Sequence, residues 1–130
     1  MNTKNHPVHN KKRLEFSSPK GLEQKLQEYP LNKGFIDWVV NLGYKIRYLD
    51  MLPAGGTSFD TREIFIRVYQ KPLVSHDLVL VHELIHISVP IESIDRVKKY
   101  EYVIDKIAKR YAKDKEFMDY IKKSIKIQPS

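Results

Sequence analysis

The feature that most constrains the fold of this chain is a set of three polar side chains inside its most apolar segment. The segment DLVLVHELIHISV, residues 77–89, is otherwise typical of a buried element, but it contains His82, Glu83 and His86. Burying an imidazole or a carboxylate is costly unless the group is hydrogen-bonded, paired or bound to a metal. A fold that buries this segment must therefore provide partners for all three side chains.

The spacing of these residues predicts a metal site. His82 and His86 stand four residues apart, so on a helix they project from one face, and both imidazoles can bind one zinc ion at about 2.0–2.1 Å. Glu83 then lies beside the ligands and is placed as a general base, which is the HExxH pattern. A chance match is expected about once in a hundred chains of this composition. The alternative is a pair of core histidines that happen to be four residues apart.

A second carboxylate interrupts the apolar stripe of the next predicted helix, at about 92–112. The apolar residues of this stripe are Ile94, Val97, Ile104, Ala108 and Tyr111. The stripe is continuous only when Glu101 is included, and Asp105 lies beside it one turn further on. Because a core-facing carboxylate requires a partner, we predict that Glu101 is the third metal ligand. The alternative is a partly exposed carboxylate that reaches toward Lys98 or Lys99.

The remaining patterns predict an α+β fold. We expect a short helix from Ser18-Pro19 to Pro30, a helix capped by Asn32 and ended by Gly43, a strand at 44–51, a turn at 53–56, one or two strands at 57–70, and helices at 76–89, about 92–112 and about 114–126. This order predicts N-terminal helices, a small and mostly antiparallel sheet, and C-terminal helices. Residues 1–17 are predicted to be a flexible basic arm, and residues 18–130 a single domain.

Composition limits the classes of protein to which the chain can belong. It has no cysteine, and therefore neither a disulfide nor a cysteine-based metal site. No apolar run is long enough to span a membrane, and no signal peptide is evident, so we expect a cytoplasmic protein. The net charge of +7 lies mostly in the N-terminal arm and the C-terminal helices. This distribution allows contact with nucleic acid, but we favour a lysine-rich solvated surface.

His82-Glu83-Leu84-Ile85-His86, followed by Glu101-Tyr102-Val103-Ile104-Asp105, resembles the HExxH plus ExxxD signature of gluzincin zinc peptidases. The resemblance implies that His82, His86 and Glu101 bind Zn²⁺ and that Glu83 is the catalytic base. It also implies that Asp105 accepts a hydrogen bond from the other ring nitrogen of His82. The length of the chain is similar to that of the minimal single-domain members, the minigluzincins and the related ImmA/IrrE-type metallopeptidases.

This resemblance implies a zinc metalloendopeptidase with a zincin-like fold that acts on peptide or protein substrates. An extended substrate is expected to pair with an edge strand, for which residues 57–69 are the candidate. Latency is a further expectation, with the cleft occupied by the N-terminal arm that carries His6 and His9, or by the C-terminal tail. No later subdomain supplies the usual histidine or tyrosine for oxyanion stabilisation. The candidates to replace it are Tyr100, Tyr102, His76 and Arg110.

Two other functions are compatible with the same residues. One is a zinc-binding regulatory protein of the ImmA/IrrE type that has little general proteolytic activity and acts on DNA-binding regulators or contacts nucleic acid. The other is a protein without metal, in which the helix pair serves only as core. Zinc content distinguishes the metal-free protein from the others, and protein cleavage that depends on Glu83 distinguishes a peptidase from a regulatory protein.

Overall fold

A computed structural model describes residues 19–69, 75–89 and 98–129 of the chain. In order, its elements are α2 (Pro19–Glu28), α3 (Lys33–Asn41), β1 (Lys45–Leu49), β2 (Gly55–Ser58), β3 (Glu63–Arg67), α4 (His76–Ser88), α5 (Lys98–Ala112) and α6 (Lys115–Ser124). The predicted α+β class is confirmed. The predicted arm at 1–17, the Ser18 cap and the start of the 92–112 helix lie outside the described residues.

Local capping interactions explain where three of the helices begin. The side chains of Asn32, Ser75 and Asp114 accept hydrogen bonds from backbone N–H groups in the first turns of α3, α4 and α6. These bonds satisfy donors that have no partner within the helix. Gly43 follows α3 with a φ of 92°, which is a backbone conformation that favours glycine. The predicted caps Asn32 and Ser75 and the predicted stop at Gly43 are therefore confirmed.

The sheet is mixed, so the prediction of a mostly antiparallel sheet was wrong. Its strand order is β1-β3-β2, with β3 parallel to β1 and antiparallel to β2. Gly55 and Gly56 were predicted to form a turn but belong to β2. The predicted edge segment 57–69 is divided, because β2 is an edge strand whereas β3 is central. Alternation along the sequence identified the buried face of β3, Ile64 and Ile66, but alternation carries no information about pairing partners.

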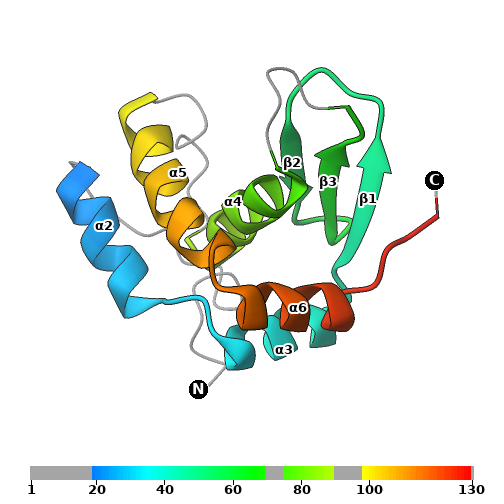
Figure 1. The fold of residues 1–130 in the computed structure, drawn as a ribbon, viewed down its shortest axis with the longest axis horizontal. Helices are drawn as coiled ribbons and strands as arrows, with labels where there is room; N and C mark the ends of the chain where they lie inside the picture. The colour runs from blue at the N-terminus through cyan, green and yellow to red at the C-terminus, as the bar shows by residue number, and fades with distance from the viewer. Residues whose placement is uncertain (1–18, 70–74, 90–97, 130) are drawn as a thin grey trace.

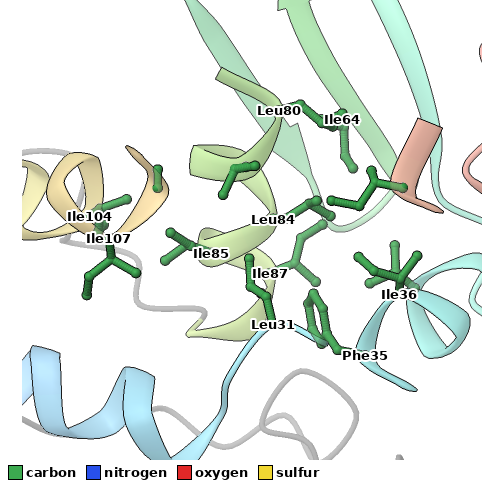
Figure 2. Packing of buried hydrophobic residues seen from close by; sticks show 14 of the residues in the cluster. Leu31, Phe35, Ile36, Ile64, Leu80, Leu84, Ile85, Ile87, Ile104 and Ile107 are labelled. Carbon is green, nitrogen blue, oxygen red and sulfur yellow. The ribbon is translucent and has the colours of Figure 1, made fainter. Parts of the chain in front are cut away.

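Helix α4 lies at the centre of the fold, between α5 and the sheet (Figure 1). Almost its whole circumference from Val79 to Ser88 is buried, which is typical of a helix enclosed on all sides. Figure 2 shows Ile85 of α4 on the side that faces Ile104 and Ile107 of α5, whereas Leu80 lies toward Ile64 of β3. The central helix that carries the HExxH residues is therefore held from two directions by apolar packing.

The C-terminal tail lies along the outer edge of β1. Ile46 forms a parallel bridge with Ile127, in which the N–H of Ile46 donates to Lys126 and its C=O accepts from Gln128. Since β1 and β2 are at opposite edges of the sheet, the described part of the tail lies on the edge opposite β2. This arrangement gives no support to the expectation that the tail occupies a cleft beside β2. None of the helices described is both long and apolar enough to cross a bilayer.

Candidate metal centre

The candidate site lies where α4 packs against α5. Helix α4 contributes His82, Glu83 and His86, and the first half of α5 contributes Glu101 and Asp105. Glu101 approaches both histidines, whereas Asp105, one turn later, approaches only His82, the earlier of the two. The two helices therefore run in opposite directions past each other. This packing brings together five residues that the sequence separates by up to 23 positions.

Three of these side chains converge through potential metal ligands. The Nε2 atoms of His82 and His86 are 3.1 Å apart. Glu101 places its Oε2 2.9 Å from the Nε2 of His82 and its Oε1 3.4 Å from the Nε2 of His86. His82, His86 and Glu101 thus form a group that is able to hold a metal ion. The predicted placement of Glu101 beside the histidines agrees with this geometry.

The geometry fits a small cation bound by nitrogen and oxygen. In a tetrahedral zinc site with bonds of about 2.0–2.1 Å, ligand atoms lie about 3.3 Å from one another. The distance between the two Nε2 atoms, 3.1 Å, is close to that value, and each imidazole has one oxygen of Glu101 nearby, Oε2 at 2.9 Å from His82 and Oε1 at 3.4 Å from His86. The Oε1 atom of Glu101 is also buried, and it lies 3.4 Å from the Nε2 of His86 without forming a hydrogen bond to it. A buried carboxylate oxygen without a donor is costly, and a cation between the three side chains would satisfy it.

Asp105 orients the first histidine. Its Oδ1 lies 2.8 Å from the Nδ1 of His82. Since a carboxylate only accepts, Nδ1 carries the proton and donates it, and in the neutral ring the lone pair is then on Nε2. Nε2 is the atom that faces Glu101 and His86. The contact expected between Asp105 and His82 is present, and it turns the lone pair of His82 toward the other ligands.

Charges in this cluster are strongly coupled in the absence of a cation. Burial by itself lowers the pKa of His82, but hydrogen bonds to Asp105 and Glu101 and the charge of Glu83 raise it to about 10. Burial raises the pKa of Glu101, but its close contacts with the imidazoles of His82 and His86 lower it to about 2. The metal-free cluster is therefore an ion pair at neutral pH. A metal ion must displace the proton of His82 in order to bind there.

A cleft of about 730 Å³ opens over this cluster. Its lining comprises Pro53, Ala54, Gly55, Gly56, Thr57, Phe59, Leu78, Val79, His82, Glu83, His86, Glu101, Asp105 and Lys109. One wall is α4 and α5, and the other is β2 with the residues on either side of it. Glu83 as a whole residue is only 7% exposed, and its Oε1 accepts a hydrogen bond of 2.9 Å from the hydroxyl of Thr57.

Some residues of this cleft were not identified from the sequence. Thr57 was expected near the edge strand, but its bond to Glu83 and the presence of Lys109 in the cleft follow from no local pattern. The four candidates for an oxyanion-stabilising side chain, Tyr100, Tyr102, His76 and Arg110, are not among the residues that line the described cleft. Tyr102 is 72% exposed, so the structure gives these candidates no support.

The resemblance to gluzincins noted in the sequence therefore depends on the HExxH and ExxxD residues alone, which the packing of α4 against α5 brings together. Five side chains carry it: the three potential ligands, Glu83 and Asp105. Comparison of the whole chain with known proteins adds no family, because no family model, no characterised protein and no solved structure is detectably similar to it.

Proposed function

We propose that this protein is a zinc-dependent peptidase in which His82, His86 and Glu101 hold the metal and Glu83 is the base. One observation carries the proposal: a three-ligand group and a buried glutamate face the same cleft from one pair of helices. Three protein ligands with a fourth position open to solvent are typical of catalytic zinc, whereas structural zinc sites have four protein ligands. Zinc is favoured because two imidazoles and a carboxylate are common ligands of its catalytic sites.

The protein's own residues divide the chemical work. When bound, zinc would lower the pKa of water and polarise a substrate carbonyl. Glu83, which belongs to α4 but is not one of the three ligands, accepts a proton from the attacking water and returns it to the leaving amine. Asp105 keeps the ring of His82 in the tautomer that presents Nε2 to the metal.

The position of β2 at an edge of the described sheet supports a peptide as the substrate. β2 lines the cleft, and among the described strands it pairs with β3 alone, so that its other edge could accept an added strand. An extended peptide alongside β2 would pass over the cluster. The expected latency is kept only as a proposal for the arm at residues 1–17. Cleavage by a variant without those residues, compared with that of the full chain, tests it.

The decisive experiment combines metal analysis with protein cleavage. The purified protein should contain about one zinc ion per chain, and Glu101→Ala should lose most of it because a ligand is removed. A general base typically raises the rate of the reaction about 100- to 10,000-fold. Glu83→Gln should therefore retain zinc, while its rate of casein cleavage falls at least about 100-fold. Glu116→Gln, at a carboxylate whose side chain is 84% exposed, is the matched control and should cleave like the wild type.

Each other function predicts a different result. Zinc bound without cleavage of casein or peptide libraries would favour the regulatory protein, and absence of zinc would favour the metal-free core. Equal zinc binding by the wild type and Glu101→Ala would refute the assignment of Glu101 as a ligand. Cleavage that persists in Glu83→Gln would refute its assignment as the base.

A further inference from the structure

The wall of the cleft opposite α4 contacts the carboxylate of Glu83 directly. In a strand, residues two apart face the same side. In β2, Gly55 and Thr57 therefore share one face. The hydroxyl of Thr57 lies 2.9 Å from the Oε1 of Glu83. A Cβ atom added to Gly55 would lie 3.2 Å from the Oε2 of the same carboxylate. Strand β2 therefore approaches both carboxylate oxygens of Glu83.

Thr57 is chemically suited to hold this carboxylate in one position. An ionised glutamate only accepts hydrogen bonds, so the hydroxyl of Thr57 is the donor in this contact. Threonine is β-branched and stiff about χ1, and it lies on a strand that is paired to β3. Glutamate, by contrast, has a long side chain with several rotamers. A bond from a rigid strand to the end of a flexible side chain restricts that side chain's position.

The small size of Gly55 allows the strand to come this close. Its added Cβ would also lie 2.6 Å from Cγ1 of Val79 and 3.0 Å from the backbone oxygen of Phe65. A side chain at position 55 would therefore push β2 away from α4. Moving the strand outward would lengthen the bond between Thr57 and Glu83, so the two positions act together.

We propose that Thr57 is a positioning residue for the catalytic base, and that β2 holds Glu83 in its reactive orientation as well as forming the wall of the cleft. The inference rests on the proposed function, in which Glu83 takes the proton. Catalysis is sensitive to placement, since a displacement of about 1 Å can cost about 100-fold in rate. Loss of the Thr57 hydroxyl should therefore reduce turnover while substrate and zinc still bind.

The test compares Thr57→Val, which removes the hydroxyl and keeps the shape, with Thr57→Ser, which keeps the hydroxyl. We expect Thr57→Val to lower kcat about 10- to 100-fold, with KM and zinc content close to those of the wild type. Thr57→Ser should restore most of the loss. Thr61→Val is the matched control, because Thr61 is exposed in the turn after β2 and does not line the cleft, and its kcat should not change.

Two results would overturn the inference. One is a wild-type kcat in Thr57→Val, and the other is a loss of kcat that Thr57→Ser does not relieve. A wild-type protein that fails to cleave would instead count against the proposed function. The contact itself is tested without activity by a double-mutant cycle of Thr57→Val and Glu83→Ala on the unfolding equilibrium. We expect a coupling of about tenfold or more, as for a hydrogen bond to a charged group, and a coupling below about twofold would refute it.

Discussion

Replacing Gly55 by alanine should destabilise the protein, although alanine is normally the better residue outside turns. The new Cβ would lie 2.6 Å from Cγ1 of Val79 and 3.0 Å from the backbone oxygen of Phe65, both closer than ordinary contact. The oxygen of Phe65 belongs to the central strand and cannot rotate away, so β2 itself must shift. Overpacking of this kind costs about 1–3 kcal/mol. The smaller backbone entropy of alanine in the unfolded chain offsets about 0.5–1 kcal/mol.

The neighbouring glycine provides a matched control. A Cβ added to Gly56 would have its nearest neighbours at 4.0 Å, the side chains of Met51 and Phe65. Gly56→Ala should therefore leave stability unchanged or raise it by up to about 1 kcal/mol. Taken together, the two variants should differ by about 2 kcal/mol in the free energy of unfolding, with Gly55→Ala the less stable.

Urea unfolding followed by circular dichroism measures this difference. For an m value of about 2 kcal/mol/M, the two midpoints should be separated by about 1 M. Because the same Cβ would lie 3.2 Å from the Oε2 of Glu83, Gly55→Ala should also reduce peptide cleavage more than Gly56→Ala does. Equal midpoints for the two variants would refute the conclusion that β2 and α4 are in such close contact.

Two further predictions concern the ion pair and the packing of α4. The pKa of His82 is raised to about 10 in the folded protein, so its stabilisation is complete below its ordinary pKa of about 6.5 and is lost as the pH rises through 10. The metal-free wild type should therefore lose more stability between pH 7 and pH 10 than His82→Gln does in urea unfolding, and parallel losses would contradict the ion pair. Ser88 is fully buried and donates a hydrogen bond of 2.6 Å to the backbone oxygen of Tyr29. Ser88→Ala should cost about 0.5–1.5 kcal/mol, because it removes this hydrogen bond, and a thermal midpoint equal to that of the wild type would show that the bond contributes nothing.

Helices and their ends were predictable because their signals are local. The side chains of Asn32 and Ser75 accept hydrogen bonds from backbone N–H groups three residues later in the chain. The stop after α3 likewise depends on one residue, Gly43, which adopts a positive φ. The sheet was predicted less well, since its strands were identified but their pairing was not. Which strand becomes central depends on contacts between residues far apart in the chain, and the alternating pattern is the same in either arrangement.

For the candidate site, the sequence alone determined that His82 and His86 share one helix face and that Glu83 lies beside it, because the helical period fixes both. It also identified Glu101 as a carboxylate in an apolar stripe. Only the tertiary structure decided that Glu101 meets both histidines, since this requires α4 and α5 to pack in opposite directions at one register. The contact between Thr57 and Glu83 likewise depends on the approach of β2 to α4, which the periodicity within a single element does not predict. Periodic patterns describe one element at a time, whereas the site is made by the packing between elements.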